Sequence, residues 1–269
     1  MSLNRKSATV PLLLELKNIT VLRNKRKILN AVSLKIAAGE NVAILGPNGA
    51  GKSSLIKIIT REYYPVLDPQ HCLFRIWGQG AWDVFELRRL LGVVTNDLQF
   101  ACARDIWGME VVLSGYFSSI GLFNERVTSA MKRKAKRIVE FLEIAHLSDR
   151  KMNAMSSGEA RRFLIGRALV HDPKALVLDE PTSSLDLHAQ YRFSTMLRKI
   201  SAAGTSIILV THNLSDIIPE INRVVLMKQG RFFQEGPKEM ILTDKNISKL
   251  FGSSVAVREK DGYYYALRA

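Results

Sequence analysis

An eight-residue pattern near the start of the chain constrains the fold more than any other part of the sequence. Residues 46–53 read Gly-Pro-Asn-Gly-Ala-Gly-Lys-Ser and match G-x-x-x-x-G-K-[S/T]. The apolar run 42–45 precedes the pattern, and Leu55, Ile58 and Ile59 follow it at helical spacing. The pattern therefore lies where a strand turns into a helix. Glycines there leave backbone N–H groups free to point at phosphates, and the helix N-terminus adds positive charge. This context favours a phosphate-binding loop over a glycine-rich turn with a lone lysine.

The loop also predicts which residues bind the nucleotide and its metal ion. We expect Lys52 to reach the β- and γ-phosphates. The Ser53 hydroxyl is expected to bind Mg²⁺, because a hard cation prefers oxygen ligands. The nucleotide-binding residues expected from this segment are Gly46, Pro47, Asn48, Gly49, Ala50, Gly51, Lys52, Ser53 and Ser54.

Two adjacent acids follow an apolar run far downstream. Residues 175–178 read as a buried strand that ends in Asp179 and Glu180, which places both carboxylates at the carboxyl edge of a sheet. We expect Asp179 to hold Mg²⁺, directly or through water, and Glu180 to accept a proton from, or orient, the attacking water. An isolated Asp-Glu pair is more often a helix cap. Combined with the phosphate-binding loop, the pair predicts an acidic catalytic strand.

Composition limits the class of protein. The 269 residues suffice for one or two domains, and no apolar run approaches the roughly 18 residues that span a bilayer. The N-terminus lacks the apolar segment of a secretory signal, so we expect an intracellular protein. Cys72 and Cys102 are far apart without metal-ligand spacing, which indicates reduced thiols. The net charge of +14 favours contact with nucleotide, nucleic acid or an anionic membrane surface without choosing among them.

Part of the surplus charge lies in one basic block. Residues 131–137 read Met-Lys-Arg-Lys-Ala-Lys-Arg within an amphipathic helical pattern. A solvated helix face is the main interpretation, and contact with lipid headgroups or a polyanion is the alternative.

The order of expected elements predicts an α/β fold. Residues 13–36 alternate as a small antiparallel sheet with a charged turn at 23–27, whereas later strands alternate with helices, as in a mostly parallel sheet covered on both faces. Residues 96–154 contain helical patterns without strands, which predicts an inserted helical subdomain. The later strands are expected at 91–95, 175–178, 206–210 and 223–227, and the helices at 111–123 with a glycine break, 127–144, 157–170, 187–202 and 214–218.

Further motifs carry a family resemblance. Met155-Ser156-Ser157-Gly158-Glu159 resembles the signature motif of ABC-type ATPases, usually Leu-Ser-Gly-Gly-Gln. Residues 184–186, Ser-Leu-Asp, resemble the D-loop of that family, and His212 its switch histidine. The resemblance extends from Leu14 to about Ser253. It implies a P-loop NTPase (RecA-like) core at 13–95 and 155–253, with an antiparallel β subdomain, the helical insert at 96–154 and a C-terminal tail at 254–269.

The resemblance also implies the cofactors and partners. ATP, with Mg²⁺, would be clamped in a head-to-tail homodimer between the phosphate-binding loop of one subunit and the signature segment of the other. Ser156, Gly158 and Asp186 would contribute to that second half of the site. His212 would bond the γ-phosphate or the attacking water.

Some residues depart from the family pattern. Ser157 and Glu159 replace the usual Gly and Gln of the signature motif, and the added carboxylate is expected to weaken the clamp on a polyanion. The family's glutamine that contacts the metal ion and water corresponds either to Asn96 or to Gln99, and we favour Gln99 because its side chain is longer. Arg23 occupies the position of the aromatic residue that stacks on adenine, and a guanidinium can also stack on a base.

Two functions fit this resemblance. The first is an ATPase subunit on the cytoplasmic face of a membrane that energises a separate permease; residues 230–251 resemble iron-chelate and molybdate-type importer ATPases. The second is a soluble ABC ATPase that acts on nucleic acid or ribosomes, which the positive charge favours. A regulatory module without hydrolysis is a third, minor alternative. The single cassette and the ordinary spacing between Lys52 and Asp179 favour the transporter subunit.

Overall fold

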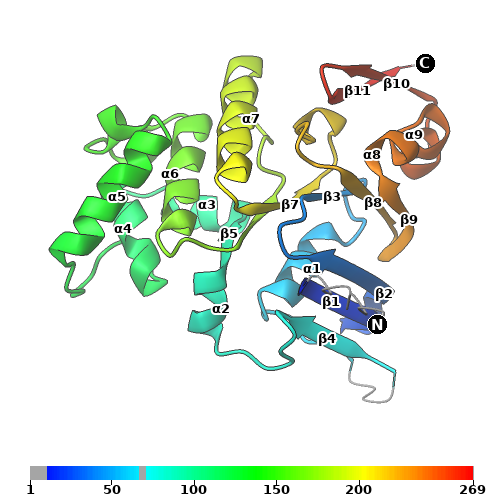
Figure 1. Cartoon of the computed structure of the whole chain (residues 1–269), viewed down its shortest axis with the longest axis horizontal. Coiled ribbons are helices and arrows are strands. Elements are labelled where there is room, and N and C mark those ends of the chain that lie inside the picture. Colours follow the sequence, from blue (N-terminus) through cyan, green and yellow to red (C-terminus); the bar gives the residue numbers. More distant parts are fainter. Residues whose placement is uncertain (1–10, 67–70, 269) are drawn as a thin grey trace, which may run out of the picture.

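A computed structural model describes residues 11–66 and 71–268 (Figure 1). Its centre is a six-stranded sheet with the order β5-β6-β7-β3-β8-β9, in which only β9 runs antiparallel to its neighbour. The carboxyl ends of the parallel strands therefore share one edge, where ligands bind in such folds. The strands are β3 (Val42–Leu45), β5 (Leu91–Val94), β6 (Ala175–Asp179), β7 (Ser206–Thr211), β8 (Arg223–Lys228) and β9 (Arg231–Pro237).

Both faces of this sheet are buried, which explains the continuous apolar runs of its strands. Val42 and Ile44 face one apolar core, which they share with α1 (Lys52–Ile59) and the antiparallel sheet. Ala43 and Leu45 face a second core beneath the helices of the other side. Successive side chains of a strand point to opposite faces of the sheet, so neighbouring residues of β3 contribute to different cores.

A separate antiparallel sheet covers the first core. It has the order β2-β1-β4 and consists of β1 (Leu12–Arg23), β2 (Arg26–Ala37) and β4 (Leu73–Ile76). Asn24 and Lys25 form the turn between β1 and β2 with positive φ angles of 49° and 61°. The prediction of a small antiparallel sheet with a charged turn is confirmed, and the sheet gains β4 as a third strand.

Helices fill the segment between β5 and β6. The expected helix 111–123 is wrong in extent, because α4 gives way to a 3₁₀ turn and Ser118 takes a left-handed φ of 54°. The expected helix 127–144 is shorter at both ends. The elements are α3 (Asn96–Cys102), α4 (Gly108–Ser114), η1 (Gly115–Phe117), α5 (Ser129–Phe141), η2 (Ala145–Leu147), η3 (Met152–Ala154) and α6 (Ser157–Leu169).

The remaining helices flank the central sheet. The predicted helix 187–202 is confirmed as α7, but 214–218 contains only a 3₁₀ turn, η4, whose backbone is capped by the Asn213 side chain. The helices are α2 (Val84–Leu90), α7 (Leu187–Ala202), η4 (Leu214–Asp216), α8 (Lys238–Ile241) and α9 (Asp244–Phe251).

Residues 255–268, which were expected to be part of a C-terminal tail, form a β-hairpin. Its strands are β10 (Val255–Lys260) and β11 (Tyr263–Arg268) (Figure 1). Strand β11 packs against η4. Thus the hairpin lies beside the segment that follows His212.

The turn between β8 and β9 ties distant parts of the chain together. The N–H of Gly230 donates to the Ala50 carbonyl (2.8 Å), and the Gly230 carbonyl accepts from Asn30 N–H (2.8 Å). Gly230 has a φ of 73°, and a Cβ there would lie 2.6 Å from the Ile28 carbonyl oxygen. Only glycine fits this position without displacing β2. The turn therefore links the phosphate-binding loop to the antiparallel sheet.

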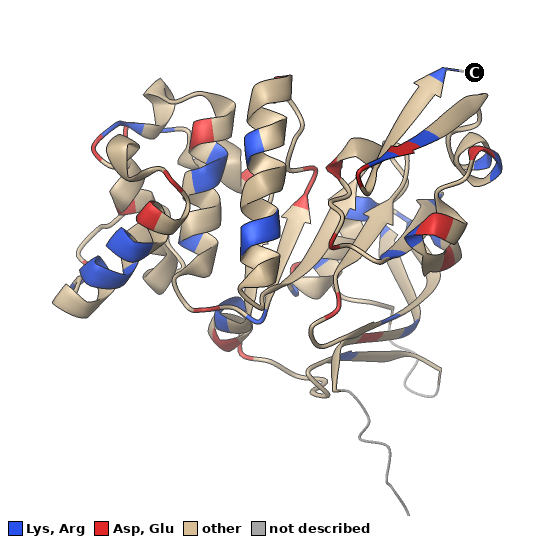
Figure 2. Cartoon of the chain, turned by 45° about the horizontal axis from the view of Figure 1, so that its top comes forward, with Lys and Arg blue, Asp and Glu red and all other residues tan. Residues whose placement is uncertain are grey.

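The basic block lies on α5, along which Figure 2 shows several blue segments. Lys132, Arg133, Lys136 and Arg137 are exposed, whereas Lys134 forms an ion pair with Asp172. The block thus forms a solvated helix face. Within residues 11–66 and 71–268, no helix is long and apolar enough to span a membrane.

Candidate functional site

The predicted phosphate-binding loop connects β3 to α1 at the carboxyl edge of the central sheet. Gly46 lies so close to β8 that a Cβ there would stand 2.2 Å from the Met227 carbonyl oxygen. The loop therefore needs a residue without a side chain at its first position. Because β6 and β7 end at the same edge, Asp179, Glu180 and His212 lie beside the loop.

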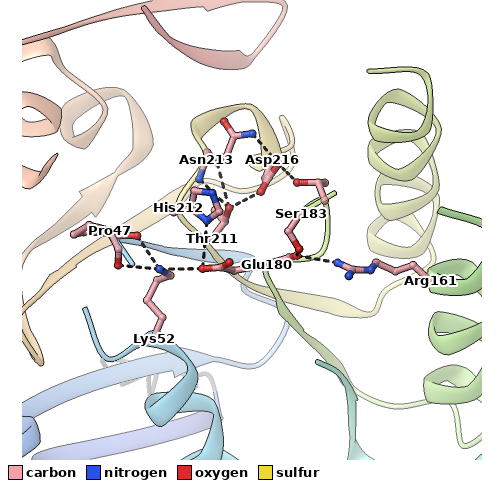
Figure 3. A network of polar contacts seen from close by, with 11 residues as sticks. Pro47, Lys52, Arg161, Glu180, Ser183, Thr211, His212, Asn213 and Asp216 are labelled. Carbon is pink, nitrogen blue, oxygen red and sulfur yellow. Dashed lines mark hydrogen bonds and ion pairs between the residues drawn. The ribbon is translucent and has the colours of Figure 1, made fainter. Parts of the chain in front are cut away.

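Lys52 is the cation at the centre of the site. Its Nζ donates to the carbonyls of Gly46 (2.8 Å) and Pro47 (3.0 Å) and lies 3.1 Å from Glu180 Oε1 (Figure 3). The side chain is only 4% exposed. The ammonium is therefore fixed at the edge of the sheet, where it can exchange the Glu180 carboxylate for a phosphate.

Glu180 stands just past β6 in a strained backbone conformation. Its φ of 46° lies in the left-handed region, which a non-glycine residue keeps only where its surroundings enforce it. Its N–H donates to the Val210 carbonyl (2.8 Å), and its carbonyl accepts from Ser183 Oγ (2.9 Å) and Arg161 Nη1 (2.8 Å). These bonds fix the direction of the Glu180 side chain.

The carboxylate of Glu180 faces two basic groups. Besides Lys52, His212 Nδ1 lies 3.3 Å from Glu180 Oε1. Burial opposes ionisation, but the hydrogen bond and charge of Lys52 outweigh it, so the pKa of Glu180 is lowered. The ionised form that a general base requires is therefore the stable one at neutral pH.

Asp179 has one carboxylate oxygen without a partner. Its Oδ1 is buried and accepts no hydrogen bond from the described residues, whereas the side chain bonds to Ser53. Burial raises the pKa of Asp179, against the hydrogen bond from Ser53. An uncompensated buried oxygen beside a serine hydroxyl fits the oxygen ligands that Mg²⁺ prefers.

Behind His212, a buried carboxyl joins the ends of two strands. Asp216 is 5% exposed, and it accepts hydrogen bonds from Thr182 Oγ1 (2.5 Å) and from Thr211 Oγ1 (Figure 3). Burial raises the pKa of Asp216. Sequence reasoning missed this residue, although an acid in the otherwise apolar stretch Leu214–Ile218 is a detectable signal.

Arg161 is a second buried residue of this network that no motif in the sequence indicates. It lies on α6, is 3% exposed, and donates from Nε to Gln99 Oε1 (2.8 Å) and from Nη2 to Asn96 Oδ1 (3.0 Å). Burial lowers the pKa of Arg161 to about 10, although Asp179 and Asp216 favour its charged form. The structure therefore brings both candidate amides, Asn96 and Gln99, onto one arginine. They lie on α3, which the Thr95 side chain caps.

Arg23 lies at the end of β1, next to an aromatic residue. Its Nη1 donates to Tyr63 Oη (2.9 Å), and its guanidinium lies 5.8 Å from the centre of the Tyr63 ring. The stacking partner of Arg23 in this structure is thus a tyrosine of the same chain.

The segment that resembles the signature motif, residues 155–159, lies at the start of α6. Ser156 caps the helix through Glu159 N–H (3.3 Å), and Glu159 Oε2 accepts from Ser156 N–H (2.8 Å). Asp186 likewise caps α7 through Ala189 N–H (2.7 Å). Over the described part of the chain, no hydrogen bond or ion pair joins Ser156, Gly158 or Asp186 to the phosphate-binding loop.

Comparisons with known proteins agree with these motifs. The profile of the ABC transporter family matches residues 29–183. A putative ABC transporter ATP-binding protein of Streptococcus mutans is 31% identical over 91% of this chain and 94% of its own. The ABC transporter ATP-binding protein YlmA of Bacillus subtilis is 33% identical over 91% and 93%. The hemin import ATP-binding protein HmuV of Bradyrhizobium diazoefficiens is 30% identical over 94% of each chain.

Solved structures show the same fold. An ATP-binding cassette of an ABC transporter in its ADP conformation superposes with a TM-score of 0.77 at 24% identity, over 89% of this chain and 98% of that one. A dimeric post-hydrolysis cassette bound to ADP and Pi superposes with a TM-score of 0.68 at 26% identity, over 83% and 98%. The predicted P-loop NTPase fold is confirmed. The chain belongs to the ABC transporter family, as one of its ATP-binding, ATP-hydrolysing cassettes.

Proposed function

We propose that this chain hydrolyses Mg²⁺–ATP at the carboxyl edge of its central sheet and thereby drives transport through a separate membrane permease. The contact of Lys52 with Glu180, beside the unpaired Oδ1 of Asp179, is the observation that carries the proposal. The reported relatives are named as transporter subunits, which supports transport over the alternative of action on nucleic acid or ribosomes.

Each residue has a distinct task in the proposed reaction. The backbone N–H groups of Asn48, Gly49 and Gly51 and the ammonium of Lys52 bind the phosphate chain of ATP. Glu180 orients the attacking water and accepts its proton, and His212 bonds the γ-phosphate or that water. Arg23, with Tyr63, offers a stacking surface to the base.

Ser53 and Asp179 are the proposed protein ligands of Mg²⁺, with Gln99 as a further contact to the metal ion or its water. When bound, Mg²⁺ supplies positive charge that stabilises the charge developing on the phosphates. The unpaired Oδ1 of Asp179 supports this ligand set, because a buried carboxylate oxygen without a donor is costly unless a cation occupies the site.

Asp179→Asn tests the metal site. We expect ATP affinity in EDTA to stay within about 2-fold of the unchanged protein, because the amide keeps the shape and removes only the anionic ligand. Hydrolysis should fall about 100-fold, since the metal contributes several kcal/mol to the reaction. Calorimetry and phosphate release measure the two effects. Asp105→Asn, an exposed acid paired with Lys151, is the control; equal losses in both variants would contradict the role of Asp179.

Gln99→Ala and Asn96→Ala decide between the two amides. We expect the larger loss of Mg²⁺-dependent hydrolysis from Gln99→Ala, because the longer side chain reaches further toward the metal ion. Steady-state phosphate release at several Mg²⁺ concentrations provides the comparison. If Asn96→Ala loses more activity, the assignment reverses.

The complete site is proposed to require two subunits in head-to-tail contact. Ser156, Gly158 and Asp186 of one subunit would close over the ATP held by the loop of the other. The separation of these residues from the loop of their own chain supports this arrangement. In the free subunit the hydroxyl of Ser156 is engaged with Glu159 (3.0 Å), so it must exchange this carboxylate for the γ-phosphate.

A hollow beside β5, between α2 and α6, is the proposed contact with the permease. The cavity of about 270 Å³ lies between α2 and β5 on one side and η1 and α6 on the other. Leu87, Leu98 and Ile120 line it, and the side chains of Phe85 and Phe100, on α2 and α3, are exposed. An apolar side chain from a permease loop fits such a hollow. This contact would place the chain on the cytoplasmic face of the membrane.

A further inference from the structure

One buried guanidinium connects three parts of the site that the chain brings from far apart. Arg161 of α6 donates to the carbonyl of Glu180 and to the side chains of Asn96 and Gln99 on α3. Figure 3 shows Arg161 reaching from α6 toward Glu180. The helix that begins at the signature segment therefore touches both the candidate base and the candidate metal amides.

The bonds of Arg161 occupy the oxygen that the metal site needs. Gln99 Oε1 accepts hydrogen bonds from Nε and from Nη2 of Arg161. A carbonyl oxygen has two lone pairs, and both are directed at this guanidinium. Gln99 can approach Mg²⁺ only after at least one of these bonds breaks.

Charge favours the same exchange. The partners that Arg161 bonds directly are uncharged oxygens, and Asp179 and Asp216 are the acids whose charges stabilise the guanidinium. A divalent cation at Asp179 would neutralise one of these two acids and repel the guanidinium. Metal binding at Asp179 and retention of Arg161 in its present place therefore oppose each other.

We propose that Arg161 is a positioning residue that holds Gln99 away from the metal site in the nucleotide-free subunit and releases it when Mg²⁺–ATP binds. Because Arg161 is part of α6, the release reaches Ser156 at the start of that helix. Arg161 also keeps the carbonyl of Glu180 in place. The inference rests on the proposed role of Gln99 at the metal ion, and it adds a device by which the signature helix senses that ion.

The test measures how strongly Mg²⁺ improves ATP binding. For each variant, calorimetry of the full chain gives the Kd of ATP in EDTA and in Mg²⁺, and the ratio of the two Kd values is the readout. Arg161→Met removes every hydrogen bond of the guanidinium and keeps a side chain of similar length. We expect the ratio to rise about 10-fold, because the Gln99 oxygen is then free of a charged donor. At the same time kcat should fall, because the Glu180 carbonyl loses one of its two side-chain donors.

Two further variants guard against a simple loss of structure. Arg161→Lys keeps the charge, but it lacks the planar fork that occupies both lone pairs, so its ratio should lie between those of the unchanged chain and Arg161→Met. Arg162→Met is the matched control, because Arg162 is a similarly buried arginine at the next position of α6. Among the described residues, Arg162 has no hydrogen bond to Asn96, Gln99 or Glu180. Its ratio should stay unchanged. A purely structural role of Arg161 would lower stability without this rise.

A double-mutant cycle with Gln99→Ala decides the mechanism. Without Gln99, adding Arg161→Met should raise the ratio clearly less than it does in the presence of Gln99, because only the charge repulsion is then removed and there is no amide to release. If Arg161→Met raises the ratio equally with and without Gln99, the exchange is overturned while the metal role of Gln99 stands. If Gln99→Ala by itself leaves the ratio as in the unchanged chain, the metal role of Gln99 is wrong and the exchange is overturned with it.

Discussion

Lys52→Ala is expected to lower the affinity for ATP by about 100-fold or more. The ammonium is the main cation in a site otherwise built from backbone dipoles, and charge-assisted contacts contribute about 1.5–3 kcal/mol each. The substitution also removes the Lys52 ammonium as a donor to the carbonyls of Gly46 and Pro47. Calorimetric titration with ATP measures the loss.

Lys57→Ala is the control for this experiment. Lys57 lies on the same helix, but it is partly exposed and pairs with Asp97 at 3.3 Å. Its removal should leave ATP affinity within about 2-fold, since an exposed ion pair contributes little. Unchanged affinity in Lys52→Ala would show that the loop is not the nucleotide site.

Glu180→Gln is expected to bind ATP and to accumulate as a dimer. The amide keeps the shape of the side chain and cannot accept a proton, so hydrolysis should slow by about 10² to 10⁴-fold, the contribution of a positioned base. Loss of the ion pair with Lys52 also leaves this lysine free for phosphate. With the γ-phosphate intact between two subunits, the pair persists, and size-exclusion chromatography with Mg²⁺–ATP detects it.

A second substitution tests which surface closes the dimer. Adding Ser156→Arg to Glu180→Gln should return the protein to a monomer, because bulk and misdirected charge then stand at the start of α6. Glu140→Gln by itself, at an exposed carboxylate, is the control for Glu180→Gln, and it should stay monomeric with Mg²⁺–ATP. Persistent ATP-dependent dimers in the double variant would mean that the signature segment is not the partner surface.

The strands of the central sheet were predictable because a strand that is buried on both faces consists of successive apolar residues, and such short apolar runs can be read in the sequence. The runs at 42–45, 175–178, 206–210 and 223–227 all form strands at nearly these positions. Their order was not predictable. The placement of β3 between β7 and β8 depends on which faces the helices cover, and no local pattern encodes that placement.

The chemistry of the phosphate-binding loop is legible in the sequence because its parts are adjacent there. Arg161 could not be found in this way, because its acceptors on α3 and after β6 are distant in the chain and its own neighbourhood reads as an ordinary helix. Ser118 shows a different limit. A left-handed serine ends a helical pattern whose apolar spacing continues beyond it.

The turn at Gly230 has a consequence for how the protein is made. During synthesis the chain emerges from its N-terminus, so the phosphate-binding motif appears long before β7 and β8, the two strands between which β3 pairs. Ala50 receives its hydrogen bond from Gly230 later still. Domains generally fold as units once their partners are present. The nascent chain therefore carries the complete motif but acquires a nucleotide-binding loop only when its last quarter has emerged.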